Sequence, residues 1–300
     1  MEIKTVLGNV LESEVGITLP HEHITCYSEF YYKMAGKIYL DKNLLLETAV
    51  KYLKEMKEVY NLSTFIDCTP VNIGRDVELL KEVAKNTGVN IICSTGFYCI
   101  DDAQLVTPPI EKMVDFIVAD AKNVNAGILK CAIENEVLSD FDEKILRAIA
   151  KAQKILNLPI VMHSNGPNKN GKKGLEILLS EDVKPQAITV GHLSDTYDID
   201  YIKEIASYGC FIGLDRLYGD MTEERFEKDV NRILALFDAG YGNQVLLSHD
   251  GLVFNGFRGE LQMEELRFAW HFKYILPKFS KEVFEKIMVE NPLKMLKCGE

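Results

Sequence analysis

The sequence lacks the features of a membrane or secreted protein. No stretch of about 18 consecutive residues, the length that spans a bilayer, is apolar, and the N-terminus has no basic segment followed by an apolar run. The seven cysteines are odd in number and none forms a CxxC pair, so a disulfide framework is not expected. We therefore expect a soluble, cytoplasmic protein with reduced, buried cysteines and no membrane partner.

The sequence is also short of positive charge. It has 34 Lys and Arg against 45 Asp and Glu, a formal net charge of -11, and no basic stripe interrupts this balance. Such a field repels a phosphate backbone, so nucleic acid is not an expected partner. The 300 residues are 47% hydrophobic, which is enough for one large core and excludes a disordered chain.

What the chain does contain is an alternation of short apolar runs with segments of helical periodicity. No linker rich in Pro, Gly or Ser divides it, so we expect a single domain over residues 1–300. The runs that predict strands are 16–23, 63–70, 90–97, 127–133, 158–164, 187–193, 210–215 and 244–250. The segments that predict helices are 44–60, 76–85, 110–122, 142–156, 175–179, 199–207, 222–238 and 263–275.

Eight such units favour a closed (β/α)8 barrel. Near-continuous apolar strands are typical of parallel sheets covered on both faces, and eight units in about 250 residues match barrel closure. The alternative is a six-stranded doubly wound sheet, but its GxGxxG fingerprint is absent after the first strand, where PHEHITC stands. The predicted fold class is therefore α/β, a TIM barrel.

Four of the six histidines stand at the ends of predicted strands: His21, His23, His163 and His192. In a barrel these ends form one face, where active sites lie. Because side chains alternate along a strand, His21 and His23 share a side while Glu22 points away, and imidazoles about 7 Å apart can converge on one cation. For this HxH motif alone, the alternative is two histidines that only make local hydrogen bonds beside a turn.

The last predicted strand ends in VLLSHD. Barrel closure places this strand beside the first, so we expect Asp250 near His21 and His23, as a metal ligand and a proton acceptor. Alternation turns His249 away from the site, into a supporting or packing role. His271, in the segment FAWHFKY, is expected on the surface or in helix packing.

Lys130 lies inside the apolar run GILKCAI. A buried, unpaired ammonium carries a large desolvation cost, so this residue needs an explanation. A neutral amine can add carbon dioxide and become a carbamate, an anionic bidentate ligand able to bridge two cations. The alternative is a lysine with a buried stem whose charged head reaches water.

Together these motifs resemble the phosphotriesterase family of the amidohydrolase superfamily. The similarity runs through GITLPHEH, GRDVELLKEVAKNTGVNII, STGFY, AGILKCAI, PIVMHSN, TVGHLSDTYDIDYI, FIGLDR, LLSHDG and ENP. The resemblance implies two divalent cations. His21, His23 and Asp250 would hold the more buried one, and His163 and His192 the more exposed one. It also implies that carboxylated Lys130 bridges both, together with a hydroxide whose parent water is acidified by the cations.

Within that family the chain looks most like the phosphotriesterase-like lactonases, because STGFY contains Tyr98 and FIGLDR contains Arg216. In that branch Tyr98 would orient the lactone or the hydroxide, and Arg216 would organise the loops. The alternatives are ordinary packing for Tyr98, and for Arg216 an ion pair with Asp215 or Asp220. Phosphotriesterase homology proteins have a glutamate where Lys130 stands, which argues against that third branch.

The segment after Asp250, GLVFNGFRGELQMEEL, is expected to pass directly into a helix. It looks shorter than the long substrate loop of acyl-homoserine lactonases. This departure favours smaller or differently shaped lactones.

The expected activity is therefore hydrolysis of a small lactone or ester, with promiscuous organophosphate triesterase activity. The cations would polarise the carbonyl while Asp250 carries the proton. The ligand types suit zinc, expected first, and also Mn, Co or Fe. The alternatives are a phosphotriesterase or other phosphoester hydrolase and, from another class, a metal- or sugar-binding barrel without turnover. The resemblance also implies a homodimer.

Overall fold

The computed structural model of the chain describes residues 2–100, 103–217, 222–261 and 267–297. Each of the eight predicted strand segments contains or overlaps an observed strand, so these predictions are confirmed. The strands are β3 (Ile17–Cys26), β4 (Leu62–Asp67), β5 (Asn90–Gly96), β6 (Ile128–Ala132), β7 (Ile160–His163), β8 (Ile188–Val190), β9 (Phe211–Leu214) and β10 (Val245–Leu247).

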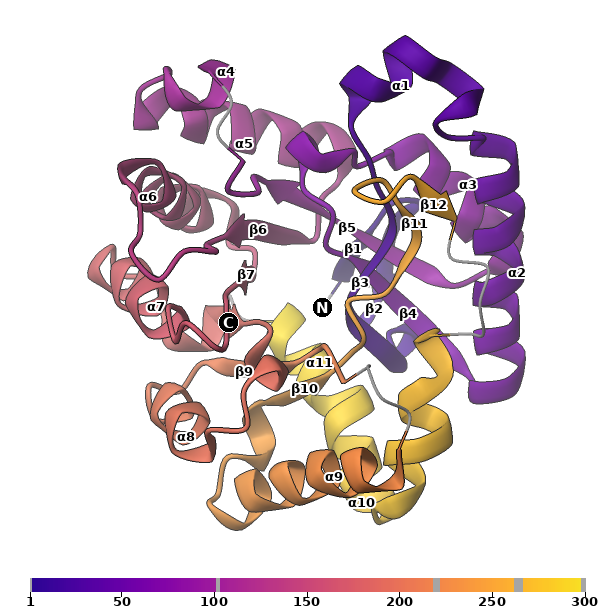
Figure 1. The fold of residues 1–300 in the computed structure, drawn as a ribbon, viewed down its shortest axis with the longest axis vertical. Coiled ribbons are helices and arrows are strands. Elements are labelled where there is room, and N and C mark those ends of the chain that lie inside the picture. Colours follow the sequence, from indigo (N-terminus) through magenta and orange to yellow (C-terminus); the bar gives the residue numbers. More distant parts are fainter. Residues whose placement is uncertain (1, 101–102, 218–221, 262–266, 298–300) are drawn as a thin grey trace.

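These strands lie in sequence order, from β3 to β10, in one sheet and pair in parallel. Two further strands extend the sheet to ten beyond β3. Of these, β11 (Leu252–Asn255) pairs in parallel with β3, and β12 (Glu260–Leu261) is antiparallel to β11. The sheet is curled, with the strands in the middle and the helices around them (Figure 1). The fold is a mixed α/β domain, consistent with a TIM-like barrel.

Both ends of the row of eight strands come together where β10 finishes. The Asp250 backbone N–H donates to the His21 carbonyl oxygen at 3.1 Å, and the His23 N–H donates to the Gly251 carbonyl at 2.9 Å. Inside the curl, apolar side chains from six different strands form one buried cluster: Ile66, Ile92, Ile128, Val161, Phe211 and Leu246. The inner face of the sheet is therefore a packed core, as expected of a barrel interior.

The predicted helices before residue 240 are also present, with their apolar faces packed against the sheet. They are α2 (Lys42–Tyr60), α3 (Val77–Thr87), α5 (Ile110–Val124), α6 (Asp140–Leu156), α7 (Gly171–Ser180), α8 (Ile199–Ser207) and α9 (Glu223–Asp238). The Asp41 carboxylate accepts the first free N–H groups of α2, and Asn61 in the left-handed conformation ends that helix. Such caps satisfy the backbone groups that a helix leaves unpaired at its ends.

Several elements were not predicted. The chain begins with a hairpin of β1 (Glu2–Thr5) and β2 (Gly8–Leu11), and α1 (Glu29–Ala35), α4 (Ala103–Val106), α10 (Lys281–Glu285) and α11 (Asn291–Leu296) are additional helices. The expectation that the chain passes directly into a helix after Asp250 is wrong, because β11 and β12 form a hairpin there. The predicted helix 263–275 lies partly outside the described residues. Its described part is a 3₁₀ turn, Arg267–Ala269, followed by the π-helical segment His271–Ile275.

No helix in the described part of the chain is long and apolar enough to cross a membrane. The cysteines within it carry free thiols, as predicted, and all except the half-buried Cys99 are buried: Cys26, Cys68, Cys93, Cys131 and Cys210. Cys298 lies outside the described residues. The boundaries of the single domain, residues 1–300, stay a prediction.

Candidate metal centre

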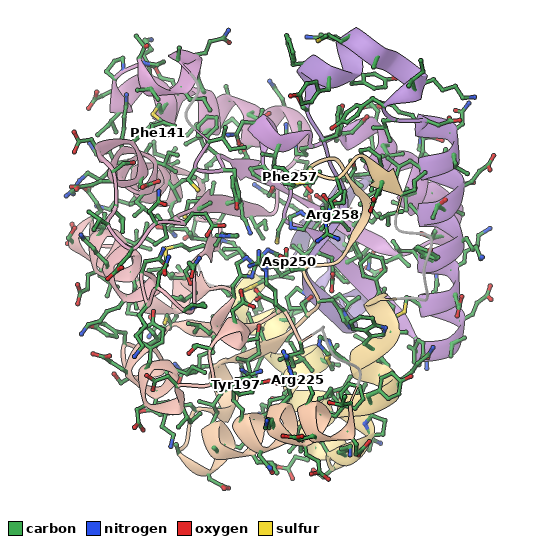
Figure 2. All side chains as sticks on the ribbon, in the orientation of Figure 1. Phe141, Tyr197, Arg225, Asp250, Phe257 and Arg258 are labelled. Carbon is green, nitrogen blue, oxygen red and sulfur yellow. The ribbon has the colours of Figure 1, made fainter. Side chains whose placement is uncertain are left out.

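The residues that the sequence analysis singled out lie together at one end of the sheet. His21 and His23 are on β3, Lys130 is on β6 and His163 ends β7, while His192 and Asp250 follow β8 and β10. Because the strands are parallel, their carboxyl ends share one edge, where α/β barrels place their active sites. In Figure 2, Asp250 lies near the middle of the ring of helices.

The first cluster consists of His21, His23 and Asp250, whose ligand atoms all lie within 4.8 Å of one another. The Nε2 atom of His23 is 2.9 Å from Asp250 Oδ1, and that of His21 is 3.6 Å from the same oxygen. Thr69 donates its hydroxyl to the Thr25 carbonyl, so the His23 Nδ1–H donates to Thr69 Oγ1 at 2.8 Å. This tautomer, inferred from the hydrogen bonds, turns the lone pair of His23 Nε2 toward a carboxylate oxygen.

His163 and His192 form a second pair of facing nitrogens. His192 Nε2 lies 2.7 Å from His163 Nδ1. The other nitrogen of each ring is next to a carboxylate: His192 Nδ1 is 2.9 Å from Asp215 Oδ1, and His163 Nε2 is 3.1 Å from Glu134 Oε1. Since a carboxylate accepts, those nitrogens carry the protons, and the two nitrogens that face each other both present lone pairs.

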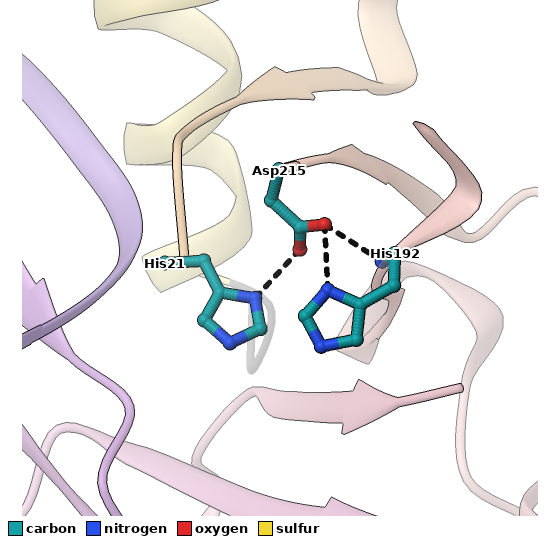
Figure 3. Close-up of side chains that lie close together, drawn as sticks. All are labelled: His21, His192 and Asp215. Carbon is teal, nitrogen blue, oxygen red and sulfur yellow. Dashed lines mark hydrogen bonds and ion pairs between the residues drawn. The ribbon is translucent and has the colours of Figure 1, made fainter. Parts of the chain in front are cut away.

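Asp215, which follows β9, was not predicted as a site residue. Its carboxylate accepts from His21 Nδ1 at 2.6 Å and from the Nδ1 and backbone N–H of His192 at 2.9 and 2.7 Å (Figure 3). It therefore fixes both imidazoles in the tautomer whose Nε2 carries the lone pair, the usual role of a carboxylate behind metal-binding histidines. The atoms of His21, His192 and Asp215 also satisfy the distances of a metal-binding group.

Lys130 is 1% exposed, so its amine does not reach water and the alternative of a solvent-reaching head is wrong. Its Nζ atom is 2.7 Å from His21 Nε2. The strand beside it approaches very closely at Gly96, in the STGFY motif. An added Cβ there would meet the Lys130 carbonyl oxygen at 2.0 Å, and φ of Gly96 is +117°. Only glycine fits this position, which lets β5 pack against the strand that carries the lysine.

The charges at the site suit cation binding. Burial, assisted by Lys130, lowers the pKa of His21 to about 4, and burial also holds the pKa of His192 well below its usual value. Burial alone would raise the pKa of Asp250, but Arg216 and the nearby histidines hold it well below its usual range. Near neutral pH His21 and His192 are therefore neutral and Asp250 is ionised, the forms that ligate divalent metals.

Two pairs of acceptor atoms face each other within 2.9 Å, His23 with Asp250 and His163 with His192. The buried Lys130 amine contacts His21 of the same cluster. Facing lone pairs repel unless a proton or a cation lies between them. The residues present therefore fit divalent cations.

Tyr98 and Arg216 both border this cluster. The Tyr98 hydroxyl is 3.2 Å from Glu134 Oε1 and 3.5 Å from His163 Nε2. Arg216 donates from Nε to Asp250 Oδ2 at 2.7 Å and from Nη1 to Asp195 Oδ2 at 3.0 Å. The arginine thus forms ion pairs, with Asp195 and Asp250. The suggested partner Asp220 lies outside the described residues.

A cavity of about 170 Å³ opens onto the cluster, lined by His23, Cys26, Ile73, Tyr98, Lys130, His163, Arg216, Asp250, Leu252 and Phe257. A larger cavity of about 640 Å³ shares Cys26, Ile73 and Phe257 with it. Its other walls come mainly from residues 27–31, 71–74 and the segment after β5, and several are aromatic. Phe257 lies at the tip of the β11–β12 hairpin (Figure 2), between the two cavities.

The remaining histidines are buried. His249 was predicted in a supporting or packing role, and its Nδ1–H donates to Glu22 Oε1 at 2.8 Å. The suggestion of a surface position for His271 is wrong, since this residue is fully buried and its ring stacks on His249 at 3.7 Å. Burial lowers the pKa of His249 to about 3.

A set of imidazoles and carboxylates at the carboxyl ends of a curled parallel sheet is typical of metal-dependent hydrolases. The chain belongs to the phosphotriesterase family, whose model matches residues 1–296. It is 34% identical to an aryldialkylphosphatase of Saccharolobus solfataricus, over 83% of this chain and 82% of the relative. It is 27% identical both to a phosphotriesterase homology protein of Mycobacterium tuberculosis and to an N-acetyltaurine hydrolase of Mus musculus, each over 98% of this chain and 97% of the relative. The protein is thus a hydrolase, and its family is metal-dependent.

Proposed function

We propose that this hydrolase opens a lactone ring with two divalent cations. The observation that carries the proposal is the cavity of about 170 Å³, which Tyr98 and the Arg216–Asp250 ion pair line together with Lys130, His23 and His163. A tyrosine hydroxyl and a carboxylate that line one cavity can serve one carbonyl group, its departing oxygen and an attacking water.

His21, His23 and Asp250 would hold one cation, and His163 and His192 the other. Lys130 would join them as a carbamate: its neutral nitrogen forms a bond to the carbon of carbon dioxide and loses a proton, leaving a carboxylate on the side chain. This modification turns a buried amine into an anionic ligand whose charge the cations compensate. Zinc is the expected metal, and Mn, Co or Fe suit the same ligands.

When bound, the cations supply two effects: they acidify a water molecule and polarise the substrate carbonyl. Asp250 accepts the proton of the attacking water and returns it to the ring oxygen as the C–O bond breaks. Arg216 holds Asp250 in the ionised form needed for the first transfer, because its Nε donates to Oδ2 at 2.7 Å. The Tyr98 hydroxyl orients the carbonyl beside His163.

The larger cavity suggests what else the substrate carries. Its aromatic and aliphatic walls meet the smaller cavity at Cys26, Ile73 and Phe257. A lactone whose ring occupies the smaller cavity would therefore place an uncharged, apolar substituent in the larger one, where burial of carbon surface favours binding.

The second candidate is a phosphotriesterase, favoured by the 34% identity to an aryldialkylphosphatase. A tetrahedral phosphorus centre has the geometry of the lactone's tetrahedral intermediate, so the same residues could serve both reactions. The third alternative, a barrel without turnover, is not supported, because the chain belongs to a family of hydrolases.

The deciding experiment compares kcat/KM for a panel of lactones with increasing alkyl substituents against that for aryl dialkyl phosphotriesters. We expect higher values for the lactones, rising with substituent size until the cavity is full. Higher values for the triesters would overturn the choice. Asp250→Asn serves as the control, since loss of both activities shows that they share one site.

We propose that β3 to β10 close into a (β/α)8 barrel within one domain of residues 1–300, with β3 and residues 248–251 forming the closure. A homodimer, the cytoplasmic location and the absence of nucleic-acid and membrane partners stay predictions.

A further inference from the structure

The row of eight strands is joined at its two ends by residues 248–251, the turn that follows β10. In the described sheet, the ladder partners of β3 are β4 and β11, whereas β10 pairs with β9. The contact between β3 and the end of β10 therefore depends on individual hydrogen bonds. The His21 N–H donates to Ser248 Oγ at 3.0 Å, and the Asp250 N–H donates to the His21 carbonyl at 3.1 Å.

Glu22 is the centre of this junction. Its side chain is fully buried, and it points away from the cavity, as strand alternation predicted. Oε1 accepts from Ser248 Oγ at 2.8 Å, from the His249 N–H at 2.9 Å and from His249 Nδ1 at 2.8 Å. Oε2 accepts from the Gly251 N–H at 2.7 Å. Four donors, all within the turn 248–251, thus converge on one carboxyl group.

Asp250 itself needs such support. Its φ is +50°, in the left-handed region that costs most residues other than glycine free energy. Glu22 accepts the backbone N–H on both sides of Asp250, from His249 and from Gly251. The strained residue is therefore fixed at both flanks by the residue that stands between the two histidines of the HxH motif.

We infer that Glu22 is a positioning residue, which clamps the turn 248–251 onto β3 and thereby sets Asp250 beside His21 and His23. The inference rests on the proposed roles of these three residues as metal ligands. It assigns the middle position of the HxH motif a task of its own: a residue of β3 positions a proposed ligand in the turn that follows β10. Supporting groups of this kind affect metal affinity about 10- to 100-fold.

The substitution that tests this is Glu22→Gln. It keeps the shape of the side chain but replaces one acceptor oxygen by an NH₂ group, which cannot accept from the donors on that side. The turn should then relax from its left-handed conformation and move the Asp250 carboxylate. We expect the dissociation constant for zinc, measured by competition with a chromogenic chelator, to rise at least tenfold.

Ser248→Ala is a second, milder variant in case Glu22→Gln folds poorly. It removes one donor to Glu22 and the acceptor of the His21 N–H, and we expect a smaller rise of the dissociation constant in the same direction. The matched control is Asp120→Asn. Asp120 binds Arg75 through two hydrogen bonds of 2.6 and 2.7 Å and contacts none of the proposed ligands. It should lower the melting temperature without changing metal affinity.

The outcomes separate the two proposals. If the unaltered protein binds two zinc ions and both Glu22→Gln and Ser248→Ala bind zinc as tightly as Asp120→Asn, the positioning role is wrong and the proposed function is untouched. If the unaltered protein binds no metal, the proposed function fails, and the inference fails with it. The inference is supported if Glu22→Gln and Ser248→Ala bind zinc more weakly than Asp120→Asn does, while the melting temperatures of the three variants are similar.

Discussion

At the scale of single residues, Lys130 is the one whose chemistry matters most for the site. Its buried amine lies 2.7 Å from His21 Nε2, in a cluster that also contains three other histidines and two carboxylates. A permanent ammonium here would repel cations, whereas a carbamate would bind them. Lys130 can therefore be a metal ligand only if it is carboxylated; without this modification its role is structural.

Lys130→Ala should lose most of the bound metal and at least a hundredfold of activity, because the bridging ligand is gone. Short carboxylates such as acetate or propionate should restore part of both, since they fill the space with an oxygen ligand. The measurements are metal content by mass spectrometry and lactone hydrolysis with and without the added acid. Metal content equal to that of the unaltered protein would contradict the bridging role.

Tyr98→Phe tests the second residue of the lactonase proposal. The change removes a hydroxyl that lies 3.5 Å from His163 Nε2 and leaves the ring packing in place. We expect kcat/KM for lactones to fall about tenfold, as for the loss of one hydrogen bond to the reacting group, while metal content stays unchanged. Tyr201→Phe, which removes a hydroxyl from a tyrosine on α8, is the control. Equal kinetics of the Tyr98 variant and that control would remove Tyr98 from the site.

The site residues at strand ends could be predicted from the sequence, because the carboxyl ends of parallel strands all lie at the same edge of a sheet. It missed Asp215 and Thr69, which orient the imidazoles from behind. For Asp215 a signal was present, since FIGLDR places it at the end of a predicted strand. Because Arg216 is its neighbour in the sequence, an ion pair between the two residues was a simpler interpretation than a contact from Asp215 to the histidines. The task of Glu22 depends on distances between β3 and the turn 248–251, which no local sequence pattern contains.

At the scale of elements, the strands and the central helices could be predicted because their apolar periodicities differ. The β11–β12 hairpin was not predicted, although Leu252, Val253 and Phe254 form a short apolar run, as in a buried strand. Residues 263–275, which follow the hairpin, have helical periodicity. For this reason the sequence predicted a helix directly after Asp250. The same hairpin carries Phe257, so the element that was not predicted also lines both cavities beside the cluster.

The stacked pair of His249 and His271 gives a prediction about pH. Burial lowers the pKa of His249 to about 3 and that of His271 well below its usual value. The unfolded chain, with histidine pKa values near 6.5, thus binds more protons than the folded one below that pH. The free energy of unfolding should therefore fall as the pH drops from about 6.5 toward 3, by up to about 1.4 kcal/mol per pH unit for each histidine.

His271→Phe should flatten this dependence, because the phenyl ring keeps the stacking but binds no proton. The measurement is urea unfolding of the metal-free protein between pH 7 and pH 4, with the slope of stability against pH compared between the two proteins. An unchanged slope would show that His271 is already protonated in the folded state.

At the scale of the whole molecule, the site joins parts of the chain that lie far apart in sequence. Ligand candidates come from β3, β6 and β7 and from the ends of β8 and β10. Bound cations would therefore stabilise the folded chain as a whole, because the unfolded chain cannot gather these ligands.

Removal of metal by a chelator should lower the melting temperature. If free metal is present at 100 times the dissociation constant, each occupied site adds about 2.7 kcal/mol to the free energy of unfolding. Two sites together should raise the melting temperature by on the order of 10 °C. Differential scanning calorimetry with and without chelator checks this, and Lys130→Ala should show a much smaller shift. Identical melting temperatures for the treated and untreated protein would contradict cation binding at the strand ends.

The most direct test of the account is the number of metal ions bound per chain. After reconstitution with zinc and removal of the free ion, elemental analysis by mass spectrometry should give two zinc ions per chain. A value near zero would contradict a metal centre of any kind, and a value of one would contradict the bridged pair.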